Sequence, residues 1–98
     1  MDLAALVARG DQLLGLRDLN AARSFYERAA ALGSGQAALH MGMTFDPAFL
    51  SRVGLHAAYG NPTQAASWYR HAAELGDTEA IELQNSIEAQ LRGRTSKN

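Results

Sequence analysis

The sequence predicts an all-α protein, and three observations support this prediction. A segment of the chain is repeated, because residues 21–38 align with residues 64–81 at a constant spacing of 43 positions. Apolar residues recur in both copies three, four and one positions apart, which is the spacing of a single helical face. Capping residues and glycines stand where such helices would begin and end. The chain is therefore expected to form helices joined by short turns.

Each copy predicts a helix, a tight turn and a second helix. The four expected helix starts carry side chains that can cap free backbone N–H groups, namely Asp18, Ser34, Asn61 and Asp77. Gly33 and Gly76 stand between the two helices of each copy, where a left-handed residue commonly ends a helix. The second helices are expected over residues 36–44 and 78–91. Because the helices stop and start so close together, each copy should form an antiparallel helical hairpin.

The remaining residues complete a single expected domain over residues 1–92. Asp2 can cap a first helix that closes near Gly15. In chain order the expected parts are a leading helix (2–15), repeat one (about 18–60), repeat two (about 61–91) and a flexible polar tail (93–98). Small residues dominate the hairpin faces and allow close helix packing. Large rings should fill the wedge between successive hairpins, namely Phe25, Tyr26, Trp68 and Tyr69.

Composition and charge exclude several classes of protein. The 98 residues are 47% hydrophobic, 19% charged and free of cysteine, so strong disorder, disulfides and cysteine-bound zinc are excluded. A formal net charge of −1 provides no field that attracts nucleic acid. The three histidines lack metal-ligand spacing, and no catalytic motif is present. We therefore expect no catalytic residue, no cofactor, no metal and no enzymatic activity.

The sequence also predicts that the chain does not insert into a membrane. The apolar run Leu3–Ala8 is far shorter than the ~20 residues of a spanning helix, and Met1-Asp2 offers no basic signal region. A cytoplasmic location is expected, with the periplasm as the alternative if the sequence is a piece of a longer exported protein.

The repeated residues resemble the Sel-one-like repeat, a relative of the tetratricopeptide repeat. That family shows an alanine, an aromatic pair, two alanines, a glycine and an alanine in the next helix. The matching positions are Ala22, Phe25, Tyr26, Ala29, Ala30, Gly33 and Ala37 in copy one, and Ala65, Trp68, Tyr69, Ala72, Ala73, Gly76 and Ala80 in copy two. The resemblance spans roughly residues 2–91 and implies a short right-handed α-solenoid. It departs from the family between the copies, where a longer and more apolar connection replaces the usual glycine-rich one.

The resemblance implies a non-catalytic protein–protein interaction module, an adaptor or scaffold of bacterial signalling or envelope assembly. Its partner would be another protein or a peptide, bound by the polar face of the first helix in each hairpin. The candidate binding residues are Ser24, Glu27, Arg28, Ser67, Arg70, His71 and Glu74. A solvated face without a ligand is the alternative for these residues. The alternative function is a structural unit whose terminal helices (2–15 and 78–91) stack in a homo-oligomer or in a longer solenoid.

Two further surfaces leave alternatives open. Within residues 45–60, a short helical turn is expected after Asp46-Pro47, followed by a glycine-bounded loop. The apolar side chains of residues 45–60 either cover the edge of a hairpin, which we favour, or form a docking patch. Acidic residues gather between Arg70 and Arg92, where they suit the start of a helix or, alternatively, a docking face for a basic partner.

Overall fold

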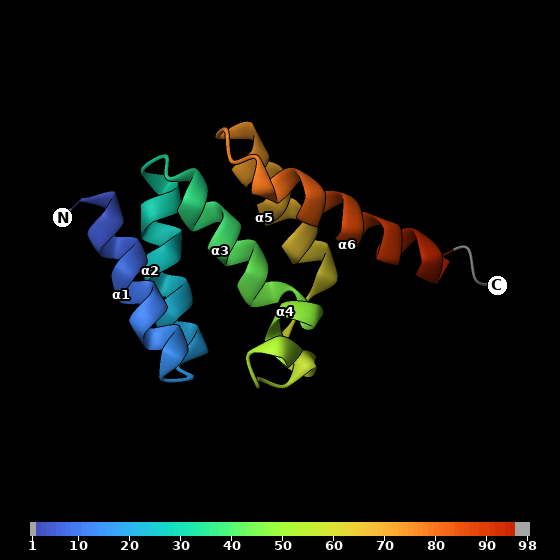
Figure 1. Cartoon of the computed structure of the whole chain (residues 1–98), viewed down its shortest axis with the longest axis horizontal. Coiled ribbons are helices and arrows are strands. Elements are labelled where there is room, and N and C mark those ends of the chain that lie inside the picture. The colour runs from blue at the N-terminus through green and yellow to red at the C-terminus, as the bar shows by residue number, and fades with distance from the viewer. Residues whose placement is uncertain (1, 96–98) are drawn as a thin grey trace.

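The computed structural model describes residues 2–95 as six α-helices and one 3₁₀ turn (Figure 1). In chain order these are α1 (Leu3–Gly15), α2 (Leu19–Ala31), α3 (Gly35–Phe45), α4 (Pro47–Arg52), η1 (Ala57–Tyr59), α5 (Pro62–Glu74) and α6 (Glu79–Thr95). The described residues contain no strand, so the prediction of an all-α chain is confirmed. The expected tail is corrected in part, because α6 continues to Thr95, whereas residues 96–98 lie outside the described residues.

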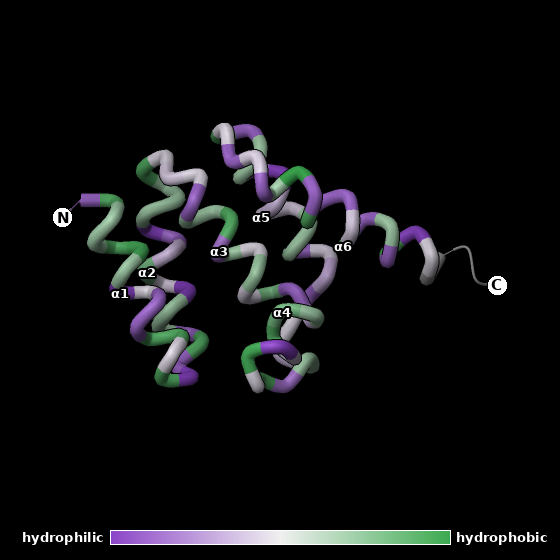
Figure 2. Tube along the Cα trace, viewed as in Figure 1, coloured by the Kyte–Doolittle hydropathy of each residue, from purple (hydrophilic) through white to green (hydrophobic). Residues whose placement is uncertain are grey.

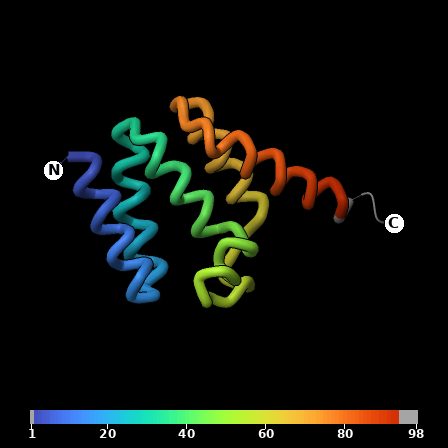
Figure 3. The backbone as a smooth tube through the Cα atoms, in the orientation of Figure 1, coloured from blue at the N-terminus to red at the C-terminus, as the bar shows by residue number. Residues whose placement is uncertain are grey.

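The long helices lie in a row and alternate in direction (Figures 1 and 3). Helix α1 packs on α2, α2 on α3 and α5 on α6, while the contact between α3 and α5 joins the two copies of the repeat. Helices α1 and α6 therefore lie at opposite ends of a molecule that measures 48 × 28 × 16 Å. Hydrophobic and hydrophilic positions alternate along the helices, as expected when each one buries a single stripe (Figure 2).

The expected helix caps form, and each one satisfies a backbone N–H that has no partner inside its helix. In every case a side-chain oxygen accepts from the N–H three residues later, over 2.8–3.2 Å, at Asp2, Asp18, Ser34, Asn61 and Asp77. Gly33 and Gly76 have φ angles of +99° and +98°, which confirms the left-handed turns. The turn after α1 is different, because Arg17 takes the left-handed position with φ +68°.

Two tyrosine rings form the centre of the core, and each lies against a glycine of an earlier helix. Tyr26 and Tyr69 are both 0% exposed. A Cβ at Gly10 would lie 2.5 Å from Cε1 of Tyr26, and one at Gly42 would overlap the ring of Tyr69. Glycine therefore leaves the space into which each ring packs.

The first aromatic residue of each pair behaves differently from the prediction. Phe25 and Trp68 pack against the core but stay only half-buried, whereas the tyrosines that follow them are fully enclosed. Adjacent residues on a helix point about 100° apart, so the two members of a pair cannot both face the same neighbouring helix. The expectation that all four rings fill the space between successive hairpins is thus corrected. The two tyrosines are buried, whereas Phe25 and Trp68 lie at the edge of the core.

Each buried tyrosine hydroxyl donates a hydrogen bond to a carboxylate. Tyr26 donates to Oδ1 of Asp11, and Tyr69 donates to Oδ2 of Asp46 over 2.7 Å. Burial raises the pKa of both tyrosines far above its usual value, and the hydrogen bond to the carboxylate raises it further. The folded chain therefore favours the neutral phenol of each tyrosine over the charged phenolate.

The raised pKa of these tyrosines predicts a loss of stability at alkaline pH. When the pKa of a group is higher in the folded chain than in the unfolded chain, the group contributes its full stabilisation at any pH below the unfolded pKa. For tyrosine the unfolded pKa is near 10, and the stabilisation is lost as the pH rises above that value. The free energy of unfolding should therefore fall as the pH rises above about 10. Denaturant titrations at a series of alkaline pH values measure this fall. A Tyr26→Phe/Tyr69→Phe double variant should show a shallower fall, and an equally steep fall in that variant would contradict the assignment.

The apolar side chains of the segment between the two copies are mostly buried or partly buried, which agrees with the covering role rather than with a docking patch. Leu50 is 0% exposed, and the neighbouring apolar side chains Phe45, Phe49, Val53 and Leu55 are partly buried. The exception is Tyr59, which remains 62% exposed. The predicted short helix is α4, and the expected loop contains the 3₁₀ turn η1.

Arg23 of α2 joins this segment to α2 and to the end of α3. Its guanidinium donates to Oγ1 and to the backbone oxygen of Thr44, at 3.2 and 2.6 Å, and to the backbone oxygen of Tyr59 at 3.2 Å. It also lies 3.8 Å from the ring centroid of Phe45. The residue 43 positions later is Ala66, so these contacts belong to copy one alone.

Replacing Arg23 with alanine is expected to lower the free energy of unfolding by about 1–2 kcal/mol, because it removes charge-assisted hydrogen bonds in a partly buried site. Denaturant unfolding monitored by circular dichroism measures this change. Arg52→Ala, on the exposed surface of α4, is a matched control and should change stability by less than about 0.5 kcal/mol. Equal effects of the two substitutions would show that the Arg23 contacts contribute nothing to stability.

Candidate functional site

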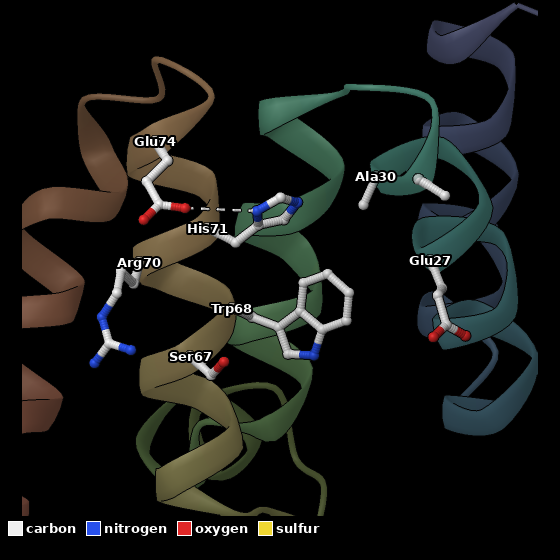
Figure 4. Close-up of a pocket in the computed structure, with 8 residues that line it drawn as sticks. Glu27, Ala30, Ser67, Trp68, Arg70, His71 and Glu74 are labelled. Carbon is white, nitrogen blue, oxygen red and sulfur yellow. Dashed lines mark ion pairs between the residues drawn. The ribbon is translucent and has the colours of Figure 1, made fainter.

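An open groove lies between α2 and α5, and its volume is about 540 Å³. Helix α3 packs against both helices and lies behind the groove (Figure 4). We call this feature the α2–α5 groove, and its lining residues are Glu27, Ala30, Ala31, Ser67, Trp68, Arg70, His71 and Glu74. Small alanines on the α2 wall leave space opposite the large side chains of the α5 wall.

The structure brings most of the predicted binding residues together at this groove. Five of the seven candidates line it, namely Glu27, Ser67, Arg70, His71 and Glu74. Ser24 and Arg28 do not. The Ser24 hydroxyl donates to the backbone oxygen of Asn20, and the Arg28 guanidinium lies 5.5 Å from the ring centroid of Phe25. The predicted stripe is therefore only partly at the groove, because Ser24 and Arg28 make their described contacts with other residues of α2.

Trp68 was expected to be a core residue, yet it is also the largest side chain in the groove. Its half-buried indole extends from α5 toward α2 and lies across from Glu27 (Figure 4). The His71 ring meets it edge-on, with centroids 6.0 Å apart. A half-exposed indole offers a large contact area at small entropic cost, which is typical of recognition surfaces.

The charged side chains of α5 divide between the groove and the neighbouring helix. Arg70 turns away from the groove toward α6 in Figure 4, and its Nη2 lies 3.3 Å from Oε2 of Glu88. Hydrogen bonds from Gln84 and Arg70 lower the pKa of that Glu88 carboxyl. Glu74 remains at the groove, with Oε1 3.9 Å from Nδ1 of His71.

The other histidines serve local contacts. His40 lies 3.1 Å from the Asp11 carboxylate and meets the Tyr26 ring edge-on, and Nδ1 of His56 accepts the backbone N–H of Ala58. Within residues 2–95, no group of three or more potential protein ligands is placed to hold a metal ion. No helix in this part of the chain is long and apolar enough to cross a bilayer.

Comparisons with protein-family models, with curated proteins and with solved structures found no significant match to this chain. The resemblance to the Sel-one-like repeat therefore rests on the residues of the two copies.

Proposed function

We propose that this chain is a non-catalytic protein–protein interaction module that binds a peptide segment of its partner in the α2–α5 groove. The observation that carries this proposal is the groove itself, in which five predicted binding residues surround the half-exposed indole of Trp68. Rigid helices form both walls, so the site is preorganised and a bound peptide would order few protein side chains.

We also propose that the fold is a short α-solenoid of the Sel-one-like type. Paired helices, left-handed glycines after α2 and α5, and one buried tyrosine in each copy support this assignment. Solenoids of stacked helix pairs present surfaces suited to extended ligands. An adaptor role in bacterial signalling or envelope assembly is the part of the proposal that the resemblance contributes.

A selection of binders from a random peptide library, followed by affinity measurements, tests the proposal. Ala31 is exposed at the groove, so Ala31→Arg would obstruct the site without entering the core. Ala89→Arg, on the exposed surface of α6, is the matched control. We expect peptides whose affinity falls at least tenfold in the Ala31 variant and is unchanged in the Ala89 variant. Peptides that bind both variants equally well would contradict binding in the groove.

The alternative function, a unit that assembles through its terminal helices, is favoured by Ile81 on α6, which is 48% exposed. One observation opposes this alternative. In α1 and α3, the residue eight positions after the helix cap is the glycine against which a tyrosine ring packs, but in α6 the residue at that position is Asn85. A ring could not pack on α6 in the same way. Sedimentation equilibrium tests this alternative, since stacking predicts a dimer at micromolar concentration that Ile81→Lys disrupts, and the interaction module predicts a monomer.

A further inference from the structure

The guanidinium groups of the arginines on α2 and α5 make their described contacts outside the α2–α5 groove, although Arg70 is among the residues that line it. Arg23 donates to the end of α3, Arg28 lies over Phe25, which lines a pocket together with residues of α1, and Arg70 pairs with Glu88 of α6. These contacts lie away from the space between the two helices, and Arg70 turns toward α6 in Figure 4.

The carboxylates at the groove are, in contrast, available to a ligand. The Glu27 carboxylate makes no hydrogen bond or ion pair with any described residue, and it faces Trp68 across the groove (Figure 4). Glu74 has the His71 ring at 3.9 Å as its neighbour at the same groove. Acidic groups beside a partly exposed indole therefore form a site of negative charge with an aromatic surface.

This combination matches the chemistry of an arginine side chain. A guanidinium is planar, stacks on aromatic rings and donates paired hydrogen bonds to a carboxylate. An aromatic face attracts a cation most strongly when the ring is that of tryptophan. A ligand with an acidic side chain would instead meet the like charges of Glu27 and Glu74, whereas the Arg70 guanidinium is paired with Glu88.

We propose that the α2–α5 groove recognises a peptide through an arginine side chain that stacks on Trp68 and pairs with Glu27. This inference rests on the proposed function and specifies the chemistry of its ligand. Glu74, on the same wall as the indole, adds to the attraction for the positive charge.

The peptides selected from the random library provide the first test. Binders that depend on the groove should share an arginine at one position. Replacing that arginine with citrulline, which keeps the shape and removes the charge, should weaken binding on the order of tenfold. Trp68 is the single tryptophan of the chain, so its fluorescence reports these titrations directly.

The pairing with Glu27 is tested by a double-mutant cycle. In a Glu27→Gln variant, the difference between the arginine and citrulline peptides should shrink at least threefold. Glu82→Gln removes the same charge from the exposed surface of α6 and should leave that difference unchanged. Trp68→Phe keeps an aromatic ring for folding and should reduce the affinity for the arginine peptide, measured by calorimetry.

The outcomes separate this inference from the proposed function. Binders that lose affinity in the Ala31→Arg variant but contain no common basic residue would overturn the arginine site and leave the groove as a peptide site. Selection of lysine in place of arginine would overturn the stacking part of the inference. If the Ala31→Arg variant weakens no selected peptide, the proposed function fails and the arginine site fails with it.

Discussion

Replacing Tyr69 with alanine is expected to lower the free energy of unfolding by about 3–5 kcal/mol, the range for truncating a large core aromatic. The ring is 0% exposed, fills the space above Gly42 and anchors α5 to α3. Its loss leaves a cavity and deprives the buried Asp46 carboxylate of its hydroxyl partner. Since domains are typically stable by only ~5–15 kcal/mol, much of the stability would be lost.

Urea unfolding monitored by circular dichroism measures this effect. Tyr59→Ala is the matched control, because this tyrosine is 62% exposed and should cost less than about 0.5 kcal/mol. Tyr69→Phe separates the ring from the hydroxyl and should cost about 1–2 kcal/mol through the lost hydrogen bond. A Tyr69→Ala variant as stable as the Tyr59 control would refute the role of the ring in joining the two copies.

Replacing Gly42 with alanine is expected to destabilise the chain by roughly 2–3 kcal/mol, although alanine is the better helix former. The added methyl group would overlap the Tyr69 ring, which is enclosed on all sides and held by its hydroxyl. The ring cannot move aside, so α3 and α5 must separate. The cost of overpacking therefore exceeds the gain in helix propensity.

The same glycine-to-alanine substitution at Gly93 is expected to have the opposite effect on stability. A Cβ at Gly93 would meet nothing within 4 Å, so alanine should stabilise α6 by up to about 1 kcal/mol. Thermal unfolding of the two variants measures the difference in sign. If Gly42→Ala also raises stability, the ring does not need the space that glycine leaves.

Much of the helical architecture could be predicted because its signals are local. Caps such as Ser34 and Asp77, and the left-handed glycines that precede them, act within a few residues of the helix ends that they define. The end of α6 was missed because residues 93–95 contain glycine and polar side chains, which predict a frayed end.

The packing of tyrosine on glycine was harder to predict because it joins distant positions. Gly10 precedes Tyr26 by 16 residues and Gly42 precedes Tyr69 by 27, since α4 and η1 intervene in the second case. A signal was nonetheless present, because each glycine lies eight residues after its helix cap. Aligning the caps Asp2 and Ser34 would have revealed the pair.

The candidate site was predicted in composition but not in shape. The repeat placed Glu27 and Arg70 at matching positions, yet one faces the groove and the other pairs with α6. Only the packing of neighbouring helices decides these directions. Trp68 was assigned to the core because its neighbour Tyr69 shares the same apolar stripe, and sequence spacing does not show which of two adjacent rings becomes enclosed.

The most direct test of the groove is the nuclear magnetic resonance signal of the Trp68 indole N–H, the single such signal in the chain. On titration with a selected peptide, this signal and the amide signals of the facing turns of α2 and α5 should shift together and saturate at one affinity. An unchanged indole signal, with shifts confined to α6 or to the α4–η1 segment, would contradict binding in the α2–α5 groove.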